Sequence, residues 1–187
     1  MRSTFKIGLV TAVISTVFLF GSFTLCTWLK EKYGWQIEVG TIRGIGGLLS
    51  IPIQGIGIYI AMQDVKKQTG MLSYGQAIKT GLTVAVTIAV VLAVSSLLYC
   101  ILDPGYAAYM VKDAQKVMIA NGEPAQQIKE HSAQVAQEFS PGMQVMQALV
   151  GQFFTGAIMS LIIGIFAKKS RAISIFIAKN EIKLPRY

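Results

Sequence analysis

Four long apolar stretches alternate with shorter polar segments along the chain. A helix needs about 20 mostly apolar residues to cross the hydrocarbon core of a bilayer, because each residue adds about 1.5 Å of length. Each stretch reaches that length, and no ionisable residue lies at the centre of any of them. The pattern predicts four transmembrane helices, at about residues 7–29, 42–62, 74–102 and 142–167.

Residues typical of helix ends support several of these boundaries. Ser73 and Gln76 have the spacing of a capping box, in which each side chain accepts a hydrogen bond from the backbone of the other residue. The third helix should therefore begin near Tyr74. The Asp-Pro-Gly sequence at 103–105 should end it. Pro141 fits the first position of the fourth helix, where proline is favoured.

The polar segment between the third and fourth spans, residues 103–140, is the longest outside the apolar stretches. It predicts two helices separated at Asn121-Gly122, the second with one apolar side. An apolar face exposed to water invites association, so this face either binds a partner or covers the outer ends of the spans. Its members include Ile128, Val135 and Phe139. The expected fold class is all-α integral membrane, with an outer, periplasmic-side helical hairpin between helices three and four.

Composition supports a membrane protein. Hydrophobic residues make up 53% of the 187 residues and charged residues 14%, whereas soluble domains carry about 25% charged residues. The net charge of +8 lies outside the apolar runs, so it indicates membrane orientation and no nucleic-acid binding. The first apolar run is longer than the roughly 7–15 residues of a signal-peptide core, so we expect it to be a retained helix.

The distribution of charge predicts the orientation. If the N-terminus is cytoplasmic, 11 of the 17 basic residues and only two of the nine acidic residues lie on the cytoplasmic side. Lysine and arginine concentrate in cytoplasmic loops. We therefore expect a multi-pass protein with both termini in the cytoplasm and a basic cytoplasmic tail at 168–187.

Small residues recur at helix-packing spacings in two spans. Glycine lets membrane helices approach closely, and the residues expected at such contacts are Gly44, Gly47, Gly55, Gly156, Ser160 and Gly164. The second span also contains Pro52 and Gln54 near its middle. These two residues indicate either a broken helix that lines a substrate path, or tight packing with a structural kink and a buried polar side chain.

Candidate chemistry is sparse. Cys26 and Cys100 lie at similar depth near the outer ends of their helices, so they either form a disulfide or pack as small apolar residues. The single histidine, His131, has no neighbours at metal-ligand spacing. The sequence contains no recognisable catalytic constellation. We therefore expect no metal, no cofactor and no enzymatic activity.

The segment Leu72-Ser73-Tyr74-Gly75-Gln76-Ala77-Ile78-Lys79-Thr80-Gly81 resembles the entry to the third span in a bacterial domain-of-unknown-function family, number 4199. The resemblance extends over most of residues 5–170, with four spans, a long helical loop before the last one, a Ser-Pro ahead of it and a basic exit. It implies the bacterial cytoplasmic (inner) membrane as the location. It implies no particular activity.

Two classes of function remain open. A non-enzymatic scaffold or accessory subunit of a cytoplasmic-membrane assembly is favoured, with membrane lipids and either a protein partner or a second copy of the chain as its contacts. The alternative is a small transporter, channel or lipid-handling protein that uses the Gly/Pro-rich second helix. The absence of ionisable residues at the centres of the spans disfavours a proton-coupled pump.

Overall fold

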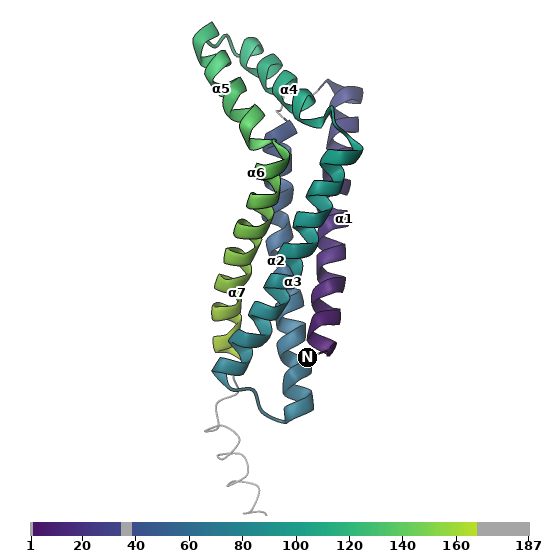
Figure 1. Cartoon of the computed structure of the whole chain (residues 1–187), viewed down its shortest axis with the longest axis vertical. Coiled ribbons are helices and arrows are strands. Elements are labelled where there is room, and N and C mark those ends of the chain that lie inside the picture. Colours follow the sequence, from purple (N-terminus) through teal and green to yellow (C-terminus); the bar gives the residue numbers. More distant parts are fainter. Residues whose placement is uncertain (1, 35–38, 168–187) are drawn as a thin grey trace, which may run out of the picture.

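Four long helices run alongside one another, and a helical hairpin stands at one end of them (Figure 1). The computed structural model describes residues 2–34 and 39–167, so the expected basic tail at 168–187 lies outside the described residues. The described elements are helices, and they follow the order α1 Arg2–Tyr33, α2 Val39–Thr69, α3 Tyr74–Leu102, α4 Tyr106–Ala120, α5 Ala125–Glu138, α6 Pro141–Met146, the π-helical segment η1 Gln147–Gly151, and α7 Gln152–Ala167.

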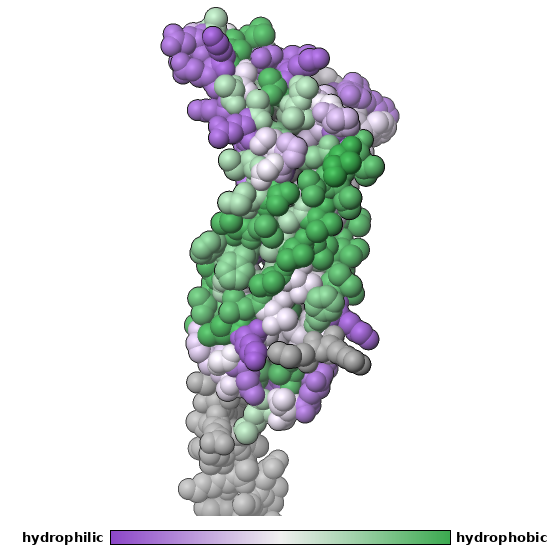
Figure 2. All heavy atoms as spheres, in the orientation of Figure 1, coloured by the Kyte–Doolittle hydropathy of each residue, from purple (hydrophilic) through white to green (hydrophobic). Residues whose placement is uncertain are grey.

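The predicted four-span, all-α membrane fold is confirmed. The described residues contain four helices long and apolar enough to cross a membrane, with lengths of 31, 26, 29 and 27 residues. On the face shown in Figure 2, apolar side chains form a band between two polar ends. One end of the molecule carries the N-terminus and the other carries α4 and α5. We call them the N-terminal end and the hairpin end.

The start of α3 follows the predicted capping box. The backbone N–H of Gln76 donates to the Ser73 hydroxyl oxygen at 3.2 Å, and the backbone N–H of Ser73 donates to the Gln76 side-chain oxygen at 2.9 Å. Both donors would otherwise lack a partner within the helix. Pro141 occupies the start of α6, as its sequence position predicts.

The fourth span differs from a regular α-helix in its first half. Between α6 and α7, the five residues of η1 form a π-helical turn. Such turns occur as single-turn bulges inside α-helices, frequently at functional sites. Here the bulge lies directly before Gln152, whose side chain faces α2.

Helix α3 is at the centre of the bundle and contacts α1, α2 and α7. Its buried face is built mainly from small and β-branched residues, which allow the neighbouring helices to approach closely. The main apolar core includes Ile58 and Met62 of α2 and Val84, Ile88 and Leu92 of α3. This core fixes the relative positions of the four spans.

The hairpin packs onto the protein itself. Helices α4 and α5 meet at Asn121-Gly122, where Gly122 has a φ of +73°, a left-handed conformation that favours glycine. Below this turn, Val135 and Phe139 are only 4% and 6% exposed. They share an apolar cluster with Phe23, Tyr106, Met110 and Ala114.

The prediction that Val135 and Phe139 form an exposed partner face on α5 is therefore wrong, because side chains of α4 and α1 already cover them. Ile128 lies nearer the tip of the hairpin and is half-buried. Of the two expectations for this face, covering the adjacent ends of the spans agrees with the structure.

Candidate functional site around the second helix

The predicted small residues of the fourth span lie against α3. A Cβ atom added to Gly156 would come within 3.0 Å of Ala85 Cβ. Ser160 is fully buried, and its side chain lies against Gly81. At Gly164 an added Cβ would lie 3.3 Å from the ring of Tyr74. This stripe therefore packs α7 against α3 inside the molecule.

The predicted packing role of two glycines in α2 is wrong. Among the described residues, no atom outside the nearby backbone of α2 lies within 4 Å of the position that a Cβ would occupy at Gly44 or Gly47, and Gly44 is exposed. A side chain at either position would point into open space. The prediction for Gly55 agrees with the structure, since an added Cβ would come 2.6 Å from Met159 Cε of α7.

Two other glycines make the close contacts between α2 and α1. An added Cβ would lie 2.9 Å from the Ser22 hydroxyl at Gly46, and under 3.0 Å from the Thr11 side chain at Gly57. A regular glycine spacing does not reveal which glycine faces a neighbour when several lie within two helical turns. Sequence reasoning missed both positions for that reason.

Helix α2 is continuous through Pro52. It runs from Val39 to Thr69, and the proline is exposed on its outer side. Proline lacks the N–H that would donate to the carbonyl one turn earlier, but the chain remains helical there. The broken second helix, one of the two expectations for this span, is absent from the structure.

Gln54 forms a polar contact inside the bundle. Its side chain is fully buried, and its Nε2 donates to Oε1 of Gln152 in α7. Within the part of the chain that the structure describes, Oε1 of Gln54 and the hydroxyl oxygen of Ser15 are buried without a hydrogen-bond partner. The expectation of a buried polar side chain at Gln54 agrees with the structure, and the partner is a residue at the start of α7.

The two cysteines are free thiols. Cys26 in α1 and Cys100 in α3 are both half-buried. Of the two expectations for them, packing as small side chains agrees with the structure and the disulfide does not. The rings of Phe20 and Phe23 contact that of Tyr99 near this level of the bundle, with centroid distances of 4.9 and 6.2 Å.

A groove of about 350 Å³ lies between α1 and α2 in the N-terminal half of the bundle. Two rows of aliphatic side chains form its walls, and the closely packed pair Thr11 and Gly57 also lines it. The rows are Ile7, Val10 and Ile14 on α1 and Ile53, Ile56 and Ile60 on α2. Both rows have the spacing i, i+3, i+7, a signal that sequence reasoning could have used.

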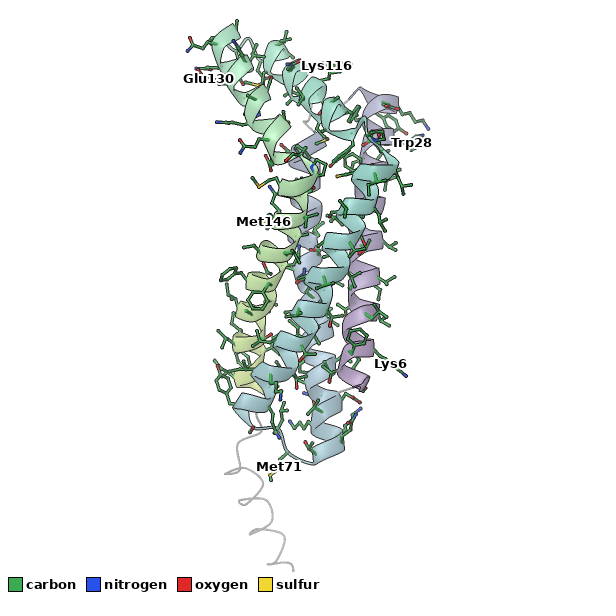
Figure 3. The ribbon with its side chains drawn as sticks, viewed as in Figure 1. Lys6, Trp28, Met71, Lys116, Glu130 and Met146 are labelled. Atoms are coloured by element: carbon green, nitrogen blue, oxygen red, sulfur yellow. The ribbon has the colours of Figure 1, made fainter. Side chains whose placement is uncertain are left out.

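Lys6 is the charged residue of this groove. It lies at the N-terminal end of α1 and extends away from the bundle (Figure 3). A second lysine of that end is already engaged, because Lys66 Nζ donates to the backbone oxygen of Ala167 at 3.1 Å. The groove thus combines aliphatic walls with an ammonium group at one end.

Comparison with known proteins identifies the family of the chain. No curated protein and no solved structure matches it significantly. A family model described as "Protein of unknown function (DUF4199)" matches residues 6–169, which include all four spans, the hairpin and the groove. The chain therefore belongs to the DUF4199 family.

Proposed function

We propose that the protein is a non-enzymatic, multi-pass lipid-binding protein of the bacterial cytoplasmic membrane. In this proposal the groove between α1 and α2 holds one acyl chain of an anionic phospholipid, and Lys6 binds the phosphate of that lipid. The observation that supports it is the groove itself, with aliphatic side chains along both walls and a lysine at one end.

The two parts of the groove contribute differently. Lipid tails are as apolar as leucine side chains, so burying an acyl chain against the protein adds little hydrophobic free energy inside a bilayer. The aliphatic walls therefore select the shape of the chain through van der Waals packing. A lysine near an anionic membrane surface contributes about 1 kcal/mol, which corresponds to a preference of about fivefold for an anionic headgroup.

The charge distribution supports the proposed orientation. With both termini in the cytoplasm, the N-terminal end of the bundle meets the cytoplasmic leaflet, which carries anionic lipids. That side holds 11 of the 17 basic residues of the chain. Lys6 would then lie at the depth of the anionic headgroups, which is what the proposed contact requires.

The scaffold or accessory role is the second candidate. It draws support from the outer faces of α1 and α7, which expose large apolar side chains such as Val17 at 67% and Phe166 at 81%. A protein partner or a second copy of the chain would cover such a face. Lipid covers it equally well, and the apolar side of α5 that favoured a partner is buried. We therefore place lipid binding first.

The experiment compares lipids retained by purified variants in nanodiscs that hold equal amounts of phosphatidylglycerol and phosphatidylcholine. After exchange into detergent, native mass spectrometry counts the bound lipids of each class. Lys6→Gln should lower the ratio of anionic to zwitterionic bound lipid about fivefold. Ile56→Trp should fill the groove and reduce the retention of both lipids.

The control is Lys67→Gln, which removes an exposed lysine from the same end of the bundle but outside the groove. It should leave the ratio unchanged. Equal effects of Lys6→Gln and Lys67→Gln would show general attraction to the membrane surface and no specific site. If the wild-type protein retains no lipid after exchange, the proposed function is wrong.

A further inference from the structure

A second cavity, of about 340 Å³, lies near the hairpin end of the bundle and is lined by residues of α1, α3 and α4. Its lining is mainly aromatic and acidic. Trp28 lies near the hairpin end of α1 (Figure 3), and the carboxylate of Glu31 comes from the next turn of the same helix. The key members of the lining are Trp28, Glu31, Tyr99, Asp103, Tyr106 and Tyr109.

The aromatic side chains are held in fixed positions by one another. The rings of Tyr99 and Tyr106 meet edge to face, with centroids 5.0 Å apart and an interplanar angle of 88°. Tyr106 makes similar contacts with Phe23 at 5.5 Å and with Phe139 of the hairpin at 5.7 Å. Such arrangements are the preferred geometry of aromatic pairs. The packing of the hairpin therefore builds the cavity wall before any ligand arrives.

The charges that line the cavity are negative. Glu31 and Asp103 line it, and no lysine or arginine among the described residues does. The nearby Lys30 forms an ion pair with the buried carboxylate of Asp113. Burial raises the pKa of the Tyr109 phenol, and the charges of Asp113 and Glu31 raise it further. Burial disfavours a charge of either sign at that hydroxyl, whereas the two carboxylates disfavour an anion and favour a cation.

The chain already places an ammonium group against one of these rings. Lys32 Nζ lies over the Trp28 ring, 4.7 Å from its centroid. Tryptophan is the strongest partner for a cation among the aromatic residues, at distances up to about 6 Å. The contact shows that a cation is accommodated at Trp28 in this structure.

We propose that this cavity binds an organic ammonium ion, of the quaternary or alkylated type. Aromatic rings that surround such a cation are its typical protein environment. A hard metal cation would need several oxygen ligands in a shell, and this cavity is lined mainly by aromatic side chains, with two carboxylates. The ammonium group can come from a zwitterionic lipid headgroup or from a small soluble amine. The proposal is independent of the lipid groove, which lies in the other half of the molecule.

The test uses the full chain with Trp35→Phe, which leaves Trp28 as the sole tryptophan, because the sequence contains two. In nanodiscs of phosphatidylglycerol, which has no ammonium group, choline is added while Trp28 fluorescence is recorded. The neutral isostere 3,3-dimethylbutanol is added in parallel. Choline should change the emission saturably, and the isostere should not. An equal response to the two compounds would overturn the proposal.

Charge variants then test which residues create the preference. Glu31→Gln and Asp103→Asn, both at exposed positions that tolerate an isosteric change, should each weaken choline binding up to about fivefold. Lys32→Gln removes a competing ammonium group and should strengthen it. Glu130→Gln is the matched control, because it removes one negative charge from α5, away from the cavity (Figure 3). If Glu130→Gln and Glu31→Gln weaken choline binding equally, the effect comes from the net charge of the protein, and the proposed site is wrong.

Nanodiscs of phosphatidylcholine distinguish the two sources of the ammonium group. If a lipid headgroup occupies the cavity, Trp28 emission starts at the choline-saturated value and added choline changes nothing. If the cavity takes only a soluble amine, choline gives the same titration curve in both lipids. Either result supports an ammonium site. If Trp28 emission is the same in the two lipids and does not respond to choline in either of them, the proposal is rejected.

Discussion

Gly156 lies at one of the close contacts between helices α3 and α7, and a single substitution can test it. The position of its missing Cβ is under 3.0 Å from Ala85 Cβ and 3.2 Å from Ala85 Cα, whereas ordinary contacts lie at 3.4–4 Å. Neither atom belongs to a flexible side chain that could move aside. In Gly156→Ala, helices α3 and α7 must therefore separate along a contact that also includes Ser160 and Gly164.

Two opposing effects set the size of the change. Overpacking a well-packed core costs about 1–3 kcal/mol, and a rigid neighbour places the cost at the upper end. Replacing glycine by alanine in a helix recovers about 1 kcal/mol. We therefore expect Gly156→Ala to lower the free energy of unfolding by about 2 kcal/mol. The matched control is Gly44→Ala in α2, where the added methyl group meets open space and stability should stay equal or rise by up to about 1 kcal/mol.

Ala85→Gly tests the cause directly. Combined with Gly156→Ala it removes the nearest clashing atom but leaves the Cα atom at 3.2 Å, so rescue should be incomplete. The wild type, the two single variants and the double variant form a double-mutant cycle. Unfolding by sodium dodecyl sulfate in mixed micelles, followed by circular dichroism, gives the free energy of unfolding of each of these four proteins. The coupling should be favourable by about 1–2 kcal/mol. A stable Gly156→Ala protein, or a coupling of zero, would refute the account of this contact.

Three further predictions follow from contacts in the same structure. Gly57→Ala should lower the melting temperature more than Gly55→Ala, because the first methyl group meets a β-branched threonine and the second meets the flexible end of a methionine. The phenol of Tyr109 should titrate above its ordinary pKa of 10.0, mainly because of burial. Folding raises this pKa, so the protonated phenol stabilises the folded protein fully below pH 10, and this stabilisation is lost as the pH rises through the pKa of the folded state. Tyr109→Phe should therefore change the pH dependence of unfolding only above about pH 10. Gln152→Leu should cost about 1–3 kcal/mol, because it leaves the amide of Gln54 buried without any partner, whereas Gln54→Leu should be close to neutral, as measured by the same detergent titration.

The sequence predicted those features that are encoded locally. The capping box at Ser73 and Gln76 is a short pattern with one structural outcome, and the structure confirms it. The four spans follow from length and composition alone. The turn at Gly122 follows from a residue that tolerates a positive φ. None of these features depends on which helix packs against which.

The direction in which each helix faces could not be predicted in the same way. In a soluble helix the polar side identifies the surface, but in a bilayer both the lipid and the core are apolar. Gly44 and Gly46 are therefore indistinguishable by hydropathy, and only the structure shows that Gly46 contacts α1 while Gly44 does not. The π-helical turn at η1 leaves no composition signal either. The groove between α1 and α2 depends on the direction in which each of these two helices faces.

The pairing of Gln54 with Gln152 is better explained by specificity than by stability. A side-chain hydrogen bond between membrane helices contributes about 0.6 kcal/mol on average. The single amide oxygen of Gln54, Oε1, is buried without a partner among the described residues, and such a group costs about 1–3 kcal/mol. The pair is therefore close to neutral or unfavourable overall. Its effect is to penalise other registers, because sliding or rotating α7 against α2 would leave the Gln54 amide wholly unpaired in an apolar core. The same register sets Gly55 against Met159, so the polar pair and the glycine contact specify one alignment of these two spans.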